Sequence, residues 1–188
     1  MSDSPKSQKP VQDGIDNRRY TRLNVSLITR IKGRRVNPKV MQKIEEGITN
    51  ISMQGAFIEC RDPFPLDTIV AFSFCLPNSP KEIDVNGVVR WCNDSREPFG
   101  MGIEFISFVQ SDRNNLRNFF KNHISASIEN VPELVKWLVD GDPLLSKAAH
   151  SALVEISAGS VNYGKDGQRW LNWYRANYPK AGNTGDAE

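Results

Sequence analysis

Two short segments contain the side chains best suited to bind an anionic or purine-containing ligand. Residues 18–22, Arg-Arg-Tyr-Thr-Arg, place guanidinium groups just before a predicted β-strand, and residues 50–55, Asn-Ile-Ser-Met-Gln-Gly, place an amide, a hydroxyl and a glycine before another. Guanidinium groups pair bidentately with phosphates and guanine edges, and glycine lets a ligand approach the backbone closely. Each segment alone also fits a simpler explanation, surface arginines in one case and a local turn in the other. Their joint occurrence, in this order and each beside a strand, favours a nucleotide site.

Alternating apolar residues predict the strands that must position these segments. Leu23, Val25, Leu27 and Ile31 occupy alternate positions within residues 22–32, as expected for a strand with one buried face. Residues 39–48 fit either a strand or a helix, and a strand is favoured because the flanking segments would pair with it. Further strands are predicted between turns rich in Pro, Gly, Asn or Asp, at residues 55–60, 67–76, 83–92 and 101–107. Short strands at this spacing predict a closed or nearly closed antiparallel β-barrel of about six or seven strands.

After residue 109 the apolar period changes to that of helices. Ser111 is the expected N-cap of a first helix whose apolar stripe contains Leu116, Phe119, Phe120 and Ile124. The sequence thus predicts that the barrel ends in a helix.

Three more helices are predicted after this one. The first covers residues 131–139, the second runs from Asp142-Pro143 to Gly159, and Asp166 caps the last. The fold class is therefore α+β, a barrel followed by an α-helical extension. The expected organisation is a flexible tail (1–16), the barrel with its terminal helix (17–125), the extension (126–178) and a second flexible tail (179–188).

The composition is ordinary for a soluble protein, but the charge is unevenly distributed. Hydrophobic residues make up 39% and charged residues 24% of the 188 residues. Residues 1–40 contain ten Lys and Arg against three Asp and Glu, whereas the rest contain fourteen against nineteen, so the basic N-terminal part favours an anionic partner. No apolar run approaches the ~20 residues that span a bilayer, and no apolar stretch follows the N-terminal charges. We therefore expect neither membrane insertion nor secretion, but a cytoplasmic location.

The sequence offers no pattern for catalysis or metal binding. Cys60, Cys75 and Cys92 lie in or beside apolar segments at wide spacings, which favours buried thiols over disulfides or a zinc site. His123 and His150 lie on predicted helices, where a surface or packing role is favoured. No Gly-rich phosphate loop or nucleophile–base arrangement occurs. The protein is therefore predicted not to be an enzyme and to need no cofactor.

At the two opening segments the sequence resembles the PilZ family, small barrels that bind the bacterial second messenger cyclic di-GMP. The family's RxxxR motif is matched by Arg18 and Arg22, and its [D/N]xSxxG motif by Asn50, Ser52 and Gly55. Residues 87–91, Gly-Val-Val-Arg-Trp, and residues 99–105, Phe-Gly-Met-Gly-Ile-Glu-Phe, are similar to the family's later strands. The resemblance covers residues 17–122, with four segments in the same order.

The resemblance implies roles for the arginines. Arg18 and Arg22 match the residues that clamp guanine edges and phosphates of cyclic di-GMP, and Arg19 is a supporting contact. Because this motif follows a flexible tail, we expect the ligand to order residues 10–22 against the barrel.

The second motif is expected to complete the site. The resemblance implies that Asn50 directs its amide toward a guanine and that Ser52 directs its hydroxyl toward a phosphate. Gly55 lacks the Cβ that would block the approach of the ligand.

The helical part is similar to about one HEAT-type repeat. The similarity rests on Asp140-x-Asp142-Pro143, on the alanine-rich stretch 147–153, and on residues 164–174. One repeat is too little for a stable solenoid, so a helix pair docked on the barrel is the favoured interpretation. Its expected role is packing or partner binding.

The leading hypothesis is a cyclic di-GMP receptor or adaptor that relays second-messenger levels to an unidentified effector protein. The resemblance implies motility, exopolysaccharide or biofilm control as the regulated process. The alternative is a PilZ-like protein–protein adaptor that acts without ligand, against which the intact arginines argue. A nucleic acid polymer is not an expected partner, because the positive charge gathers around the first strand rather than over a strand face.

Overall fold

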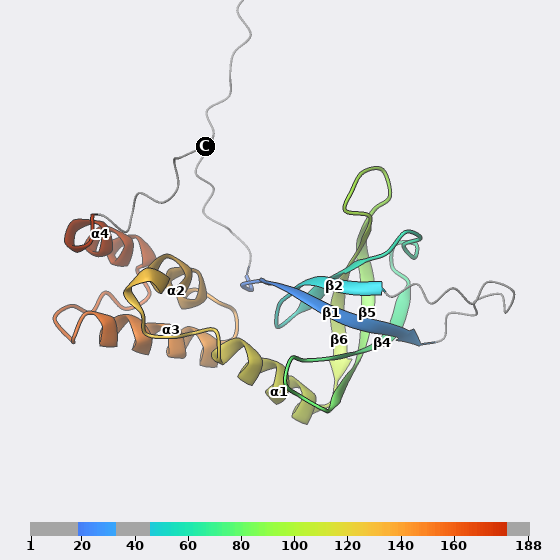
Figure 1. Ribbon diagram of the computed structural model, residues 1–188, viewed down its shortest axis with the longest axis horizontal. Coiled ribbons are helices and arrows are strands. Elements are labelled where there is room, and N and C mark those ends of the chain that lie inside the picture. Colours follow the sequence, from blue (N-terminus) through green and yellow to red (C-terminus); the bar gives the residue numbers. More distant parts are fainter. Residues whose placement is uncertain (1–18, 33–45, 180–188) are drawn as a thin grey trace, which may run out of the picture.

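The described part of the chain forms a β-barrel followed by a group of helices (Figure 1). The computed structural model describes residues 19–32 and 46–179. Its strands are β1 (Leu23–Lys32), β2 (Glu46–Ile51), β3 (Gly55–Glu59), β4 (Ile69–Cys75), β5 (Glu82–Asn93) and β6 (Gly100–Phe108). They pair antiparallel in the closed order β1-β2-β3-β6-β5-β4, with β4 returning to β1. This confirms the predicted closed antiparallel barrel.

The barrel is held together by the alternation of inward and outward side chains. On β1, Leu27 and Thr29 are 5% and 4% exposed, whereas Ile28 between them is 65% exposed. Thr29 is a polar group in this interior, and its hydroxyl donates to the carbonyl of Ser73 on β4 at 2.9 Å, which offsets the cost of burying it. The other strands fill the interior with large apolar side chains: Ile48, Ile58, Phe72, Phe74, Ile83, Val89, Met101 and Phe105. The interior is therefore a packed core, and any ligand must bind on the outer wall or at an end.

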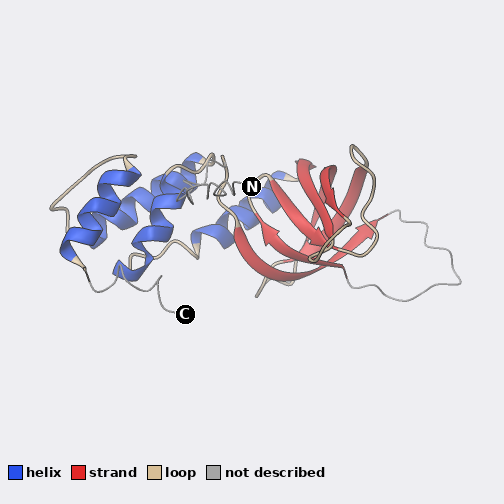
Figure 2. Ribbon diagram, turned by 90° about the horizontal axis from the view of Figure 1, so that it is seen from above, coloured by secondary structure: helices blue, strands red, loops and turns tan. Residues whose placement is uncertain are grey.

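Helices follow the last strand and extend the core. They are α1 (Gln110–Lys121), α2 (Val131–Leu138), α3 (Pro143–Ile156) and α4 (Gly167–Asn177), with a 3₁₀ turn at Ile128–Asn130 before α2. Figure 2 shows α1 beside the barrel and the remaining helices farther away, a unit that we call the helical extension. The rings of Phe120 on α1 and Trp137 on α2 lie 5.4 Å apart. One buried cluster therefore runs from the barrel through α1 into the extension.

Two helix caps occur as predicted and a third does not. Asp142 accepts hydrogen bonds from the amides of the first turn of α3, and Asp166 accepts one from Arg169 at the start of α4. Ser111 is not the N-cap of α1, because β6 leads directly into the helix and the cap position is Val109. Ser111 therefore lies within the first turn, where its hydroxyl donates to Asp112 at 3.3 Å.

The end of α3 agrees with the prediction that Gly159 ends this helix. The last helical residue is Ile156, and the amide of Gly159 donates to the carbonyl of Val154 at 3.0 Å. Ser157 is the C-cap residue, and its hydroxyl donates to the same carbonyl at 2.9 Å. Gly159 follows with φ +70, the left-handed conformation that glycine adopts without strain.

The strand predicted at residues 39–48 can be compared with the structure only over residues 46–48. Residues 39–45 lie outside the described residues, as do the predicted tails apart from Pro179. The described strand β2 continues to Ile51, so Asn50 lies within a strand, opposite Asn24 of β1. Cross-strand pairing, rather than the local apolar pattern, sets this boundary.

The cysteines are not all buried. Cys60 is buried and Cys92 is intermediate, whereas Cys75 is exposed, which corrects the prediction for that residue. Cys75 lies at the end of β4, where the alternation of the strand turns its side chain outward. Among residues 19–32 and 46–179, no helix is long and apolar enough to cross a membrane.

Candidate functional site

An open hollow of about 340 Å³ lies on the outer wall of the barrel, and residues from both opening segments line it. This volume is within the range of about 300–1,000 Å³ that small-molecule pockets occupy. Arg19, Tyr20 and Arg22 line it from residues 19–22, a segment that precedes β1 and that we call the arm. The remaining lining residues come from the β2–β3 turn and from β3, β5 and β6. The fold thus brings together two segments that the sequence separates by about thirty residues.

The arm contributes cationic and aromatic side chains to the hollow. Arg19, Tyr20 and Arg22 all line it, and Arg19 and Arg22 are exposed. The guanidinium carbon of Arg19 lies 5.6 Å from the centre of the Tyr20 ring, within cation–π range. Arg18 lies outside the described residues, so its role stays a prediction.

Ser52 lines the hollow, but its hydroxyl is occupied by the β2–β3 turn. The oxygen accepts from the amides of Gln54 and Gly55 at 3.3 and 3.1 Å, and the hydroxyl donates to the Gly55 carbonyl at 3.2 Å. The backbone amide of Ser52 donates to the same carbonyl at 2.8 Å. Ser52 is 5% exposed, so its principal contribution here is to fix the shape of this wall.

Gly55 is required by the barrel as well as by the hollow. A Cβ at this position would collide with the carbonyl oxygen of Ile103, on the neighbouring strand β6. Gly55 pairs with Glu104 in the ladder between β3 and β6. The close approach of two strands therefore explains the glycine before any ligand is considered.

Asn50 is not among the residues that line the hollow. Its amide nitrogen donates to the side-chain oxygen of Asn24 on β1 at 3.0 Å. This bond links β1 and β2 just behind the arm. The structure therefore separates Asn50 from Ser52 and Gly55, and its predicted contact with guanine stays untested.

The floor of the hollow is an aromatic surface that the sequence motifs did not identify as part of the site. Trp91 of β5 is 42% exposed and stacks on Phe57 of β3, with ring centroids 5.1 Å apart and an interplanar angle of 6°. A Cβ at Gly102 would collide with the indole of Trp91, so glycine there lets the ring lie flat against β6. A half-exposed indole held in this way is a platform on which a planar base can stack.

A third arginine stands beside this platform. Arg90 donates from Nε to Glu104 at 2.6 Å, and its Nη1 lies 3.3 Å from Asp67. The hydrogen bond that Arg90 donates to Glu104 raises the pKa of Arg90, and the charges of both carboxylates add to this effect. The guanidinium is therefore positioned and fully charged at the rim of the hollow.

A register shift between Val89 and Trp91 explains why both Arg90 and Trp91 face outward. Adjacent residues on a regular strand point to opposite faces, but a bulge places two consecutive side chains on one side. From the sequence, residues 87–91 are predicted only to form a strand of the barrel. The sequence does place a polar residue, Arg90, next to an aromatic one, Trp91. Alternation alone, however, would put their side chains on opposite faces of the strand.

A larger hollow, of about 680 Å³, lies between β1 and α1, and it has a different chemistry. Asparagines, serines and His123 contribute its polar lining, and neither lysine nor arginine lines it. It lacks the cationic groups that a phosphate needs, so the smaller hollow is the better candidate for a nucleotide.

The described residues contain no arrangement typical of a metal centre. Within residues 19–32 and 46–179, no group of three or more His, Cys, Asp or Glu side chains could hold a metal ion. His123 Nδ1 lies 2.9 Å from the Phe119 carbonyl, and His150 Nε2 lies 2.9 Å from the side chain of Asn162. Both histidines stand away from the hollow, on or just after helices.

The six-stranded barrel with an arginine-bearing arm matches a known family. The model of the PilZ domain matches residues 16–122, more than half of the chain, and the chain belongs to this family. The match covers the arm, the barrel and α1 but not the helical extension. The similarity of the extension to HEAT-type repeats therefore stays a prediction.

Similarity to characterised proteins beyond the family is low. No curated protein matched the sequence. A solved structure similar to this chain is that of the Bacillus subtilis inhibitor of motility MotI/DgrA, at 22% sequence identity and a TM-score of 0.46. That likeness covers 58% of this chain and 52% of the other, so the chain spans about half the length of that protein.

Proposed function

We propose that this protein binds cyclic di-GMP in the hollow between the arm and the barrel, and acts as a receptor that relays its occupancy to a partner protein. One observation supports this above all others. Arg19 and Arg22 of the arm, residues of the β2–β3 turn, and Trp91 line the same hollow. Membership of the PilZ family makes a cyclic dinucleotide the first ligand to test.

The side chains around the hollow fit the chemistry of this ligand. The O6 and N7 acceptors of guanine match the paired donors of a guanidinium, which Arg22 and Arg18 would supply. The two phosphodiester charges would be attracted by Arg19, whereas the charge of Arg90 is already paired with Glu104 and Asp67. Stacking on an aromatic ring contributes about 1–3 kcal/mol per base, and Trp91 offers that ring.

Ser52 and Gly55 have a shaping role in this proposal. Because the hydroxyl of Ser52 closes the β2–β3 turn, the turn presents a fixed wall of backbone and small side chains to the ligand. Occupancy would then be communicated to a partner protein in motility, exopolysaccharide or biofilm control. These processes follow from the family alone.

Calorimetric titration of the full chain with cyclic di-GMP tests the proposal. We expect binding by the unmutated protein and weaker binding by Arg22→Ala and Arg18→Ala. A charge-assisted hydrogen bond is worth about 1.5–3 kcal/mol, so each substitution should weaken binding about tenfold or more. Arg30→Ala is the matched control, because Arg30 is exposed on β1 and does not line the hollow.

The outcomes separate the proposal from its alternative. No heat from the unmutated protein would reject the receptor and favour a PilZ-like adaptor that works without ligand. Equal affinities in the unmutated protein and in both arginine variants would show that the protein binds cyclic di-GMP but that the two arginines do not contribute to the site.

A further inference from the structure

The arm touches the helical extension as well as the ligand hollow. The amide of Gly141 donates to the carbonyl of Arg19 at 2.6 Å, and the amide of Thr21 donates to Asp140 Oδ2 at 2.6 Å. The hydroxyl of Thr21 donates to the Lys136 carbonyl at 3.1 Å. Every one of these contacts falls between the end of α2 and the turn that leads into α3. Residues 19–22 therefore lie between the extension on one side and the hollow on the other.

Gly141 fits closely against the arm. A Cβ at this position would lie 2.8 Å from the Tyr20 ring and 2.9 Å from the Arg19 carbonyl oxygen. Both distances are shorter than a Cβ contact tolerates, and one of the two atoms belongs to the backbone. A side chain at residue 141 would therefore displace the arm.

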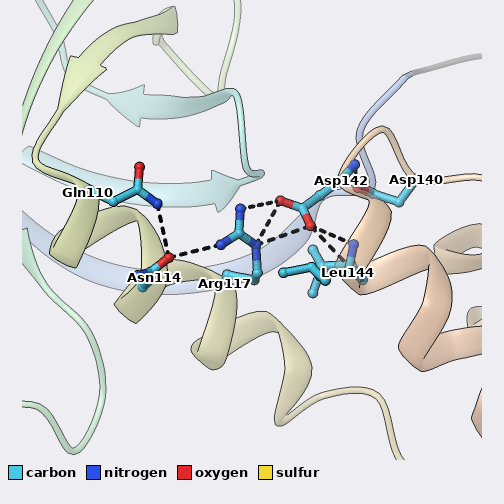
Figure 3. A network of polar contacts seen from close by, with 7 residues as sticks. Gln110, Asn114, Arg117, Asp140, Asp142 and Leu144 are labelled. Carbon is cyan, nitrogen blue, oxygen red and sulfur yellow. Dashed lines mark hydrogen bonds and ion pairs between the residues drawn. The ribbon is translucent and has the colours of Figure 1, made fainter.

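The turn that holds the arm is itself fixed to α1, the helix that follows the barrel. Asp140 is 6% exposed, and while its Oδ2 accepts from Thr21, its Oδ1 accepts from the amide of Asp142 at 2.7 Å. Asp142 caps α3 and pairs with Arg117 of α1, whose Nη2 lies 2.8 Å from Asp142 Oδ2 (Figure 3). The Nε of Arg117 also donates to Oδ2, at 2.9 Å. A continuous chain of polar contacts thus connects α1, the α2–α3 turn and the arm.

We propose that the α2–α3 turn is part of the cyclic di-GMP site, with Asp140 and Gly141 as positioning residues that hold the arm beside the hollow. The inference rests on the proposed function. An unanchored arm must be ordered when ligand binds, and that ordering reduces the apparent affinity. The extension removes much of this cost by fixing the arm through its backbone in advance. By linkage, ligand that engages the arginines strengthens the contact between arm and extension by the same factor.

Substitutions in the turn test the proposal without touching a predicted ligand contact. Gly141→Ala introduces the colliding Cβ. Asp140→Asn leaves one oxygen for two backbone amides, so either the Thr21 bond or the Asp142 bond is lost. We expect each variant to weaken binding of cyclic di-GMP about tenfold in calorimetry of the full chain.

Matched controls separate this effect from general damage to the fold. Gly47→Ala is a second glycine-to-alanine change, and its Cβ would be 3.8 Å from the Leu27 carbonyl oxygen, an ordinary contact. Glu155→Gln neutralises an exposed carboxylate on α3. Both controls should bind within about twofold of the unmutated protein, as expected for substitutions away from the site.

Hydrogen exchange in the absence of ligand supplies a readout that a purely structural role would not give. We expect the amide of Thr21 to exchange faster in Gly141→Ala and Asp140→Asn, while amides of β5 and β6 keep the unmutated rates. In a double-mutant cycle, Gly141→Ala should weaken the binding free energy less in the Arg22→Ala background than in the unmutated protein, because both substitutions act through the arm.

The outcomes also separate this inference from the proposed function. Unchanged affinity in both turn variants, together with weakened binding in Arg22→Ala, would overturn the inference and leave the receptor intact. Additive effects in the double-mutant cycle, or faster exchange throughout the barrel, would likewise overturn it. Absence of binding by the unmutated protein would reject the receptor and this inference with it.

Discussion

At the scale of single residues, Trp91 combines exposure with a fixed orientation. Its ring stacks on Phe57 and lies over Gly102, so it loses little freedom when a planar ligand covers it. An exposed aromatic side chain without such support would pay for its ordering on binding. The indole is therefore expected to contribute affinity independently of the arginines.

Replacement of Trp91 tests that contribution. Trp91→Ala should weaken cyclic di-GMP binding by about 1–3 kcal/mol, the value of one base–aromatic stack, and Trp91→Phe should keep part of it. Calorimetry measures the loss, and the change in tryptophan fluorescence on titration should disappear in both variants. Trp173→Phe, on α4, is the control for the fluorescence signal. Unchanged affinity in Trp91→Ala would show that the ring packs against the barrel only.

The same residues show what the sequence could and could not predict about the site. Arg22, Ser52 and Gly55, which the motifs grouped as one site, line a common hollow, because motif residues close to strand ends are placed by the strands. Trp91 was missed because a register shift, which depends on the partner strand β6, turns it outward. The need for glycine at residue 55 was ascribed to the ligand, whereas the carbonyl of Ile103 already imposes it.

At the scale of elements, the pair Arg117–Asp142 joins the barrel helix α1 to α3. The side chains are 17% and 4% exposed, so the pair is largely removed from water. Removing one partner of such a pair leaves an uncompensated buried charge, which costs about 3–5 kcal/mol. Arg117→Ala should therefore lower the free energy of unfolding by about this amount, as measured by urea denaturation.

An exposed pair and a pH series make this prediction specific. Lys136→Ala removes a partner of Glu133, a pair that is 58% and 42% exposed, and should cost about 0–1 kcal/mol. Burial opposes ionisation of Asp142, but the hydrogen bonds and charge of Arg117, together with the amides of Leu144 and Leu145, outweigh it and lower the pKa of the carboxyl. A lowered pKa stabilises the fold above the ordinary value of about 3.9, and this stabilisation is lost as pH falls through the folded pKa. Arg117→Ala should thus lose less stability on acidification than the unmutated protein, and parallel pH profiles would contradict the assignment.

Asp140 responds to pH in the opposite direction. Burial raises the pKa of its carboxyl, against the lowering effect of the amides of Asp142 and Thr21. Its contribution to stability is complete below the unfolded pKa and is lost as pH rises through the raised folded value. A carboxyl whose burial opposes its ionisation, yet which holds the arm by a 2.6 Å hydrogen bond, is better explained by positioning than by folding.

Elements were predictable where local patterns determine them. Alternation identified β1, and the Asp142 and Asp166 side chains marked the starts of α3 and α4 as expected. The boundary of β2 and the start of α1 were not predictable, because pairing with β1 and the direct continuation of β6 set them. Tertiary contacts override local propensity at such positions.

At the scale of the whole molecule, the extension and the arm are brought together by contacts between residues far apart in sequence. Thr21 and Asp140 are separated by 119 positions. Both hydrogen bonds between the arm and the turn use backbone amides, which every residue except proline carries. No pattern of residue types therefore predicts them. The helical extension is the part that the family match does not cover. For this reason the sequence predicted its role least well.

Because one core joins the barrel and the extension, ligand binding should stabilise both of them together. A ligand at 100 times its Kd stabilises the folded state by about 2.7 kcal/mol. For a chain of this size, each kcal/mol of stabilisation raises Tm by about 2–4 °C, so Tm should rise by about 5–10 °C. The protection that accompanies this rise should extend beyond the hollow to the amides of residues 136–142, since they contact the arm.

Hydrogen exchange with and without cyclic di-GMP checks how far the effect reaches. We expect slower exchange in the arm, in the β2–β3 turn and at residues 136–142 of the unmutated protein, with α4 less affected because it lies away from the arm. In Gly141→Ala, saturating ligand should still protect the β2–β3 turn while residues 136–142 keep their free-state rates. Protection confined to the barrel in the unmutated protein would mean that the extension does not sense the ligand through the arm. Equal protection of residues 136–142 in both proteins would instead direct the coupling through α1 and the Arg117–Asp142 pair.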